Sequence, residues 1–74
     1  PWTVEMKVKD LRVWLAVKRQ VRFSELFHER LSRLELVVTF LALLELIRQR
    51  YARAVQERAF EEIIVAFCSD SVES

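Results

Sequence analysis

Hydrophobic residues are most concentrated between positions 34 and 47, in the segment LELVVTFLALLELI. Glu35, Thr39 and Glu45 are the only residues of this segment that are not apolar. In a helix, its apolar side chains would cover about half of the circumference, which is wider than the stripe that a surface helix needs. They form two adjacent stripes, one of Leu36, Leu43, Leu46 and Ile47 and the other of Val37, Phe40, Leu41 and Leu44. We expect the first stripe to face the core. The second is covered either by another layer of the domain or by a partner protein.

The N-terminal third of the chain repeats apolar residues at helical spacing. Val4, Val8, Leu11 and Leu15 recur on one face and predict a helix over residues 4–19. Thr3 is placed to cap the start of this helix. Residues 21–23 are β-prone, and Ser24 is a candidate N-cap for a short second helix over residues 25–30.

A capping box predicts the start of the third helix. Ser32 and Glu35 have the Ser-x-x-Glu spacing in which each side chain bonds the backbone amide of the other residue. The helix should then run to about Gln49. Residues 51–56 and 60–67 are predicted as strands joined by residues 57–59, with Glu61 and Glu62 on opposite faces of the second strand.

Helix, short strand, two helices and a hairpin is the order of a winged helix domain. We therefore predict an α+β winged helix fold for residues 1–68, with three helices, a small antiparallel sheet and a C-terminal β-hairpin as the wing. The polar segment 69–74 is predicted to be a frayed, disordered tail. Because the chain has no glycine, we expect its turns not to depend on positive φ angles.

Composition excludes several classes of function. The chain has 74 residues and a net charge of +1, from 12 basic and 11 acidic residues, so no overall charge attracts it to nucleic acid or anionic lipid. The longest uncharged run, residues 36–44, is too short to span a membrane. The single cysteine, Cys68, can form no internal disulfide and, with no other ligands clustered nearby, no zinc site. These features fit a reducing, cytoplasmic setting. The first residue is Pro1 rather than Met, which indicates a piece of a longer protein.

Catalysis has little support in this sequence. His28 is the only histidine and is expected at the surface, beside Glu25, Glu29 and Arg30. Adjacent glutamates on a strand do not form a paired acid and base, and Cys68 is more typical of a small apolar filler than of a nucleophile. We therefore predict no enzyme activity, no cofactor and no metal.

The segment SRLELVVTFLALLELIRQ, followed by Gln56, Phe60 and Ile63, resembles the C-terminal domain of segregation and condensation protein A, the bacterial kleisin family. The preceding FSELF resembles the family's entry into the second helix. Arg50, Ala59 and Glu61 depart from the family pattern, which has Gly, Pro and Gly at these places.

The resemblance implies a function in chromosome condensation and segregation, at the nucleoid. Kleisins bridge the two ATPase heads of a structural maintenance of chromosomes (SMC) dimer and close a ring around DNA, and their C-terminal domain binds one head. A central segment, absent from this chain, binds segregation and condensation protein B. We expect DNA to be contacted only indirectly. The implied partner surface is the stripe of Val37, Phe40, Leu41 and Leu44, with possible wing contacts from Arg53, Val55, Gln56 and Phe60.

Two other functions remain open. In winged helix repressors the third helix reads base edges with polar side chains, but the second stripe here has none, and Glu35 and Glu45 would repel phosphate. A DNA-binding module would instead have to use the basic cluster of Arg48, Arg50, Arg53 and Arg58. A dimerisation module that pairs the apolar stripes of two copies is the third possibility.

Overall fold

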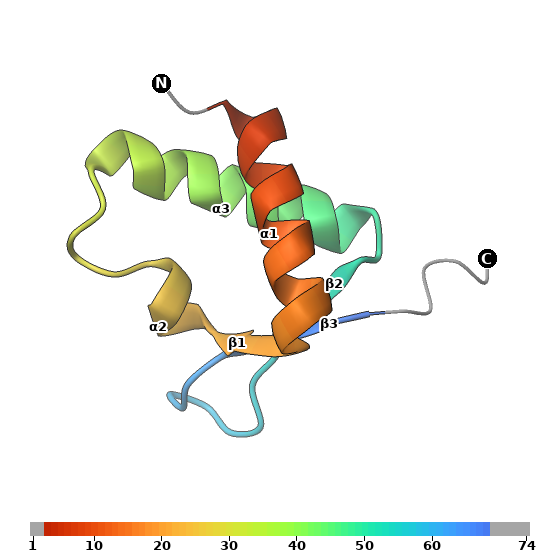
Figure 1. The fold of residues 1–74 in the computed structure, drawn as a ribbon. Helices are drawn as coiled ribbons and strands as arrows, with labels where there is room; N and C mark the ends of the chain where they lie inside the picture. The colour runs from red at the N-terminus through yellow and green to blue at the C-terminus, as the bar shows by residue number, and fades with distance from the viewer. Residues whose placement is uncertain (1–2, 69–74) are drawn as a thin grey trace.

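The computed structural model describes residues 3–68 of the chain. Its elements are α1 (Val4–Lys18), β1 (Gln20–Arg22), α2 (Phe23–Leu26), α3 (Arg33–Arg48), β2 (Ala52–Val55) and β3 (Ile64–Phe67). The strands form an antiparallel sheet in the order β1-β3-β2, so the last strand lies in the middle. Figure 1 shows α1 lying across α3, with the sheet and the loop between β2 and β3 below them. The predicted α+β, winged-helix-like fold is confirmed.

Helix α1 begins where the sequence predicts and ends one residue early. The Met6 N–H donates to the Thr3 side chain at 3.1 Å, which caps the first turn. After Lys18 the chain turns at Arg19, whose N–H donates to the Leu15 carbonyl. Val8, Leu11 and Leu15 are buried on one face, as their spacing predicts.

The second helix differs from its prediction. It covers Phe23–Leu26 rather than residues 25–30, and Ser24 lies inside it rather than at its N-cap. Both the N–H and the hydroxyl of Ser24 donate to the Glu62 carboxylate, at 3.2 and 2.9 Å. The Phe23 N–H donates to the Ile63 carbonyl, so α2 starts two residues early because the sheet fixes its first turn.

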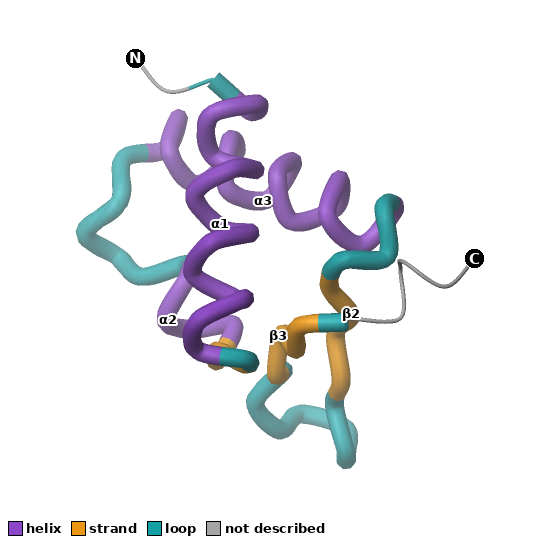
Figure 2. The backbone as a smooth tube through the Cα atoms, turned by 45° about the vertical axis from the view of Figure 1, so that its right-hand side comes forward, coloured by secondary structure: helices purple, strands orange, loops and turns teal. Residues whose placement is uncertain are grey.

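The hairpin also differs from its prediction. β2 and β3 are four residues each, and residues 56–63 form a connection longer than the predicted 57–59. Glu61 and Glu62 lie in this connection, not on a strand with opposite orientations. Pairing begins at Val55 and Ile64, where β3 first lies between β1 and β2. Figure 2 shows the connection extending away from the three helices.

Three turns depend on positive φ angles, contrary to the expectation from the absence of glycine. Arg19, Arg50 and Phe60 have φ angles of 74°, 66° and 69°. A residue with a Cβ is strained in this region. Two of the three positions follow the last turns of α1 and α3, where glycine most often ends a helix.

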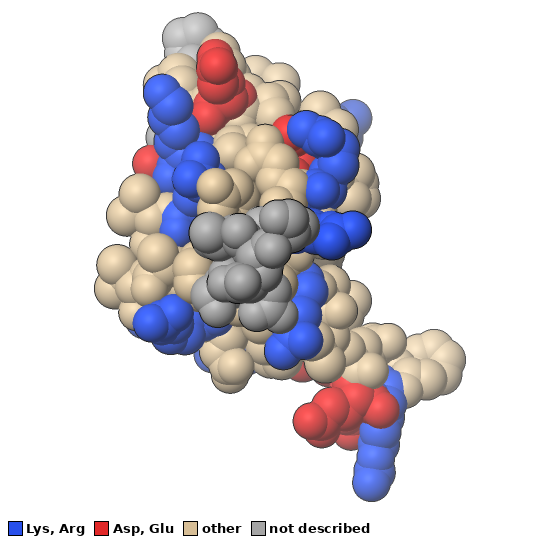
Figure 3. Space-filling view, turned by 90° about the vertical axis from the view of Figure 1, so that its right-hand side faces the viewer, with Lys and Arg blue, Asp and Glu red and all other residues tan. Residues whose placement is uncertain are grey.

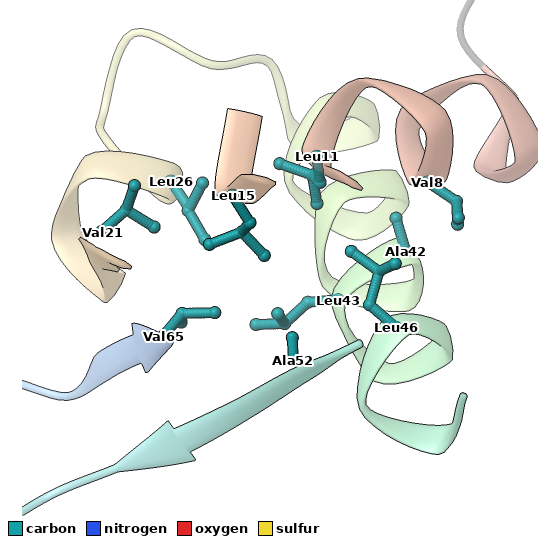
Figure 4. Packing of buried hydrophobic residues seen from close by; sticks show 10 residues of the cluster. All are labelled: Val8, Leu11, Leu15, Val21, Leu26, Ala42, Leu43, Leu46, Ala52 and Val65. Atoms are coloured by element: carbon teal, nitrogen blue, oxygen red, sulfur yellow. The ribbon is translucent and has the colours of Figure 1, made fainter. Parts of the chain in front are cut away.

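The core lies where α1, α3 and the sheet meet. Leu15 from α1, Leu43 and Leu46 from α3, and Val65 from β3 point toward one another (Figure 4). Leu26 of α2 and Ala52 of β2 close the same cluster. Because Leu15, Leu46 and Val65 are almost completely buried, this cluster fixes the orientation of α3 and so decides which of its side chains remain outside.

Candidate functional site

The candidate site is built on α3, which its capping box starts at a defined residue. The Ser32 N–H donates to the Glu35 carboxylate at 2.9 Å, and the Glu35 N–H donates to the Ser32 hydroxyl at 3.1 Å, as the sequence predicts. The buried residues of α3 are Val38, Thr39, Ala42, Leu43 and Leu46. With one face held in the core, the helix presents its opposite face outward.

Four large apolar side chains lie on that outward face. Val37, Phe40, Leu41 and Leu44 are each 45–50% exposed, and we call them the α3 apolar surface. They belong to the second stripe of the sequence, and the described part of the chain provides no second layer that covers them. In the first stripe, Leu43 and Leu46 are buried, whereas Leu36 and Ile47 are half-buried. The division into two stripes is therefore confirmed.

The apolar area includes two residues beyond the four predicted ones. Leu34 is exposed one turn before Val37, at the same helical spacing. On the other side, the ring of Phe27 lies edge-on to that of Phe40, with centroids 6.3 Å apart, and stacks on Phe23 at 4.4 Å. The sequence prediction missed both Leu34 and Phe27. The i, i+3 spacing could have found Leu34, whereas Phe27 comes close only through the fold.

Charged groups occur at the ends of α3 rather than along the α3 apolar surface. Hydrogen bonds from the Ser32 backbone and hydroxyl hold the pKa of Glu35 below its ordinary value. Arg48, which donates to Glu45 at 3.0 and 2.6 Å, lowers the pKa of Glu45 with help from Gln49. The pKa of Arg48 is raised by the same pair. Both carboxylates are therefore negative at neutral pH, and they would repel a phosphate backbone laid along α3.

The predicted wing residues lie apart from α3. Arg53 and Val55 pair with Ala66 and Ile64, so they share the face of the sheet opposite to buried Ala52. Gln56 is exposed and its side-chain amide donates to the Glu61 carbonyl at 2.7 Å, which closes the connection. Phe60 is fully exposed at a positive φ angle. The wing and the α3 apolar surface are thus two separate groups of candidate contacts, and Figure 1 shows α3 above the sheet and the connection between β2 and β3 below it.

The edges of the sheet are defined by the order of its strands. Because β3 lies in the middle, the outer edges belong to β1 and β2. β2 is the wing strand, and it carries Arg53 and Val55. An edge strand is a template on which another chain can pair.

The predicted basic cluster is dispersed. Arg48 is paired with Glu45, and Arg50 occupies a turn at positive φ. Arg53 lies on the outer face of the sheet, and Arg58 lies in a connection that also carries Glu57, Glu61 and Glu62. The wing tip is therefore acidic on balance, which is unfavourable for contact with phosphate.

Groups that could support chemistry are not assembled. His28 is exposed in the loop after α2, rather than in a helix. Cys68 is half-buried, and its N–H donates to the Tyr51 carbonyl. Over residues 3–68, no three His, Cys, Asp or Glu side chains lie close enough together to hold a metal ion. Within the same residues, no helix is long and apolar enough to cross a membrane.

Comparison with known proteins gives a consistent result. The model of the family described as segregation and condensation protein ScpA matches residues 4–68. A protein named segregation and condensation protein A from Caldanaerobacter subterraneus subsp. tengcongensis is 41% identical over 66 residues, which are 89% of this chain and 27% of that protein. Its counterpart in Brevibacillus brevis is 37% identical over 71 residues, or 96% of this chain and 27% of that protein.

A third relative, from Clostridium perfringens strain 13, carries the same name and is 44% identical over 59 residues, 80% of this chain and 24% of that protein. The chain thus spans about a quarter of the length of the curated relatives that it matches. Since the family match covers every helix and strand described above, the chain belongs to the family of segregation and condensation protein ScpA.

Proposed function

We propose that this chain is a non-catalytic interaction domain of a bacterial kleisin, and that it binds the head ATPase domain of an SMC protein through the α3 apolar surface. One observation carries the proposal. Four large apolar side chains on one face of α3 are about half exposed, although the domain's own core is already filled by the other face of the helix. Contiguous exposed apolar area of this kind is typical of an interface with another protein.

The composition of this surface favours a protein partner over DNA. Its side chains have no hydrogen-bonding groups with which to distinguish base edges. Phe40 supplies an aromatic side chain at the centre, supported from below by Phe27. Aromatic residues held rigidly at the centre of an apolar patch contribute most of the binding free energy in many protein interfaces.

The wider role rests on family membership. The relatives are named for segregation and condensation, so we propose that the full-length protein acts on chromosomes in the cytoplasm, at the nucleoid. Binding of one SMC head by this domain would help to close the ring of SMC and kleisin around DNA. DNA would then be contacted indirectly, and segregation and condensation protein B would bind a part of the protein outside this chain.

A wing contact is a second element of the proposal. The outer edge of β2 has unpaired backbone groups within the described sheet, and Arg53 and Val55 lie on its open face. A strand of the SMC head that added to this edge would gain backbone hydrogen bonds while the α3 apolar surface supplied burial. Gln56 and Phe60, in the connection that follows β2, are further candidate contacts.

Titration of the chain with a purified SMC head domain that contains its ATPase core tests the proposal directly. We expect a 1:1 complex by calorimetry, weakened more than about a hundredfold by Leu44→Arg. Val17→Arg on α1 is the matched control, because Val17 is exposed and outside both proposed contacts. A head domain that binds the Leu44→Arg variant as tightly as the unchanged protein would contradict the assignment of the surface.

The two alternative functions predict different results. A DNA-binding module would bind one duplex in preference to scrambled competitor at physiological salt, measured by gel shift. The arrangement of the arginines and of Glu57, Glu61 and Glu62 does not favour this. A dimerisation module would show a concentration-dependent mass in solution that Leu44→Arg abolishes, and an isolated domain with an uncovered apolar surface could form such a dimer without its partner.

A further inference from the structure

A second apolar depression lies away from the α3 apolar surface, between α1 and the ends of β2 and β3. It has a volume of about 500 Å³. One wall is formed by Val13, Leu15 and Ala16 of α1, and the other by the rings of Tyr51 and Phe67. We call it the α1–sheet groove. It shares no residue with the α3 apolar surface, and its volume is within the range of about 300–1,000 Å³ that is usual for ligand pockets.

The two walls of the groove are held in fixed positions. Leu15 is buried in the core, which anchors the α1 wall. Ala52 pairs with Phe67 at the end of the sheet, and the Cys68 N–H donates to the Tyr51 carbonyl at 2.8 Å, which ties the two aromatic residues together. The α1 wall is itself open to solvent, since Val13 is 65% exposed. The groove is therefore a preformed apolar surface rather than a closed part of the core.

The charged side chains that line this groove are basic. Lys9 and Arg12 line its α1 side, and the described lining includes no Asp or Glu. The Arg12 guanidinium lies 4.1 Å from the centre of the Tyr51 ring, and that of Arg19 lies 5.3 Å from the centre of the Phe67 ring. Figure 3, which views the side toward which β3 runs, shows Lys and Arg on either side of an area of uncharged surface, together with some Asp and Glu.

Cation–π contacts with the aromatic rings hold these two guanidinium groups beside the groove. A guanidinium that lies over a ring face keeps its N–H donors in its own plane, from which they can bond a carboxylate. Within residues 3–68, the ion pairs join Arg22 to Glu25 and Arg48 to Glu45, so neither Arg12 nor Arg19 is paired with a carboxylate there. Two cations thus stand beside an apolar hollow.

We propose that the α1–sheet groove is a second docking site, and that its occupant is a short segment of another protein chain in which large apolar side chains alternate with Asp or Glu. The apolar side chains would fill the hollow between Val13 and Phe67. The carboxylates would bond Lys9, Arg12 and Arg19 around it. Charge complementarity indicates an acidic occupant, because a basic or neutral apolar segment would leave these cations without carboxylate partners. Nucleic acid fits less well, since a phosphate backbone has no apolar side chains for the hollow.

Three synthetic peptides distinguish these requirements. The first, DELEFED, combines apolar and acidic residues. The second, DESESED, keeps the charge and loses the apolar residues, and the third, KKLKFKK, keeps the apolar residues and reverses the charge. We expect DELEFED to shift the NMR amide signals of residues 9–16, 51 and 67 in the full 74-residue chain, and to bind at least about tenfold more tightly than either of the others. Equal binding of KKLKFKK, or shifts confined to α3, would overturn the proposal.

Variants of the chain locate the site. The double substitution Lys9→Glu and Arg12→Glu should weaken DELEFED at least about tenfold and strengthen KKLKFKK. Val13→Asp should also weaken DELEFED, and because Val13 is exposed, the variant should keep the circular dichroism spectrum of the unchanged chain. Leu44→Arg, on the other surface, is the matched control and should leave peptide binding unchanged. If Leu44→Arg weakened DELEFED as strongly as Val13→Asp does, the peptide would be binding at the α3 apolar surface and the groove proposal would fail.

Other occupants of the groove give different outcomes, and each would overturn the proposal. A truncated variant that ends at Cys68 lacks Asp70 and Glu73. If this variant bound DELEFED more than about tenfold more tightly than the full chain, the chain's own last residues would be the occupant. Shifts at residues 9–16 that appear on raising the concentration of the chain alone, together with a dimer mass, would identify a second copy. Displacement of DELEFED by duplex DNA at concentrations at which DESESED does not displace it would identify nucleic acid.

Discussion

Leu43 and Leu44 are neighbours in the sequence, yet the side chain of Leu43 is 3% exposed and that of Leu44 is 46% exposed. One residue corresponds to about 100° of rotation around a helix, and this rotation carries the chain from the core to the α3 apolar surface. The same substitution at the two positions therefore tests two different roles. At one position it acts on folding, and at the other on binding.

Arginine at these two positions should have opposite effects. Leu44→Arg or Phe40→Arg leaves the core intact, so thermal melting should change little. It removes an apolar contact of about 1.5–3 kcal/mol and places a charge against an apolar partner, so binding of the SMC head should weaken by more than about 3 kcal/mol. Leu43→Arg places the charge among Leu15, Leu46 and Val65, and should unfold the domain. Circular dichroism melts and titration with the head measure both effects.

This comparison can fail in two ways. If Phe40→Arg and Leu44→Arg melt the domain as severely as Leu43→Arg, the outward stripe belongs to the fold rather than to an interface. If both variants fold and bind the SMC head normally, the partner uses another surface. Leu46→Arg repeats the core substitution one turn away and should behave as Leu43→Arg does.

The sequence predicts those features that depend on interactions between residues close together in the chain. The capping box of Ser32 and Glu35 spans three residues, and both of its hydrogen bonds are present. The separation of Leu43 from Leu44 follows from helical period alone. The outward direction of the α3 apolar surface follows too, because the orientation of the helix is fixed once Leu43 and Leu46 are known to be buried. The sequence left open whether another layer of the domain covers this surface, and only the structure shows that it is exposed.

Features set by contacts that are distant in the sequence were not predictable in this way. Serine is a favoured N-cap residue, but Ser24 donates hydrogen bonds to Glu62, which is 38 residues later, and α2 starts before Ser24. Residues 60–63 belong to the predicted strand, but ladder pairing begins only at Ile64, where both neighbouring strands are present. The α1–sheet groove likewise depends on Tyr51 and Phe67 meeting across the sheet. No local pattern reports such pairs.

Binding of the SMC head at the wing should protect backbone amides in β2. An added strand would pair with its outer edge, and hydrogen-bonded amides exchange slowly. Hydrogen exchange with and without the head should therefore show new protection within Ala52–Val55, whereas central β3 is already paired on both sides and should change less. Protection that appears only in α3 would show that the wing edge is not part of the interface.

Acid should destabilise the domain through the ends of α3. The pKa values of Glu35 and Glu45 are lowered in the folded state, by Ser32 and by Arg48, respectively. The unfolded chain then binds more protons, so the stabilisation from these groups is present above their ordinary value of 4.5 and is lost as pH falls below it, through the folded pKa values. Thermal melts from neutral pH down to about pH 3 measure this loss.

Glu35→Gln is the control for that titration. Glutamine can still return a hydrogen bond to the Ser32 N–H, so the capping box should persist. The titrating group is gone, and the decline in melting temperature with acid should become shallower. A variant that loses stability in acid as steeply as the unchanged protein would show that the acid transition arises at other carboxylates.

Thr39 should be less favourable than valine at its position in the core. Its side chain is 2% exposed, and its hydroxyl oxygen has no hydrogen-bond partner among the described residues. A buried hydroxyl without a partner costs about 1–3 kcal/mol, and valine has nearly the same shape without that group. We expect Thr39→Val to raise the free energy of unfolding by about 1 kcal/mol, or the melting temperature by about 4–8 °C for a domain of this size.

Thr39→Ala removes the same hydroxyl but also a methyl group, so its stability should increase less than that of Thr39→Val or should fall. Urea unfolding of the three proteins measures the order. Binding of the SMC head should be the same in all three proteins, because Thr39 lies on the inner face of α3. Lower stability in Thr39→Val than in the unchanged protein would mean that the hydroxyl makes a favourable hydrogen bond in solution.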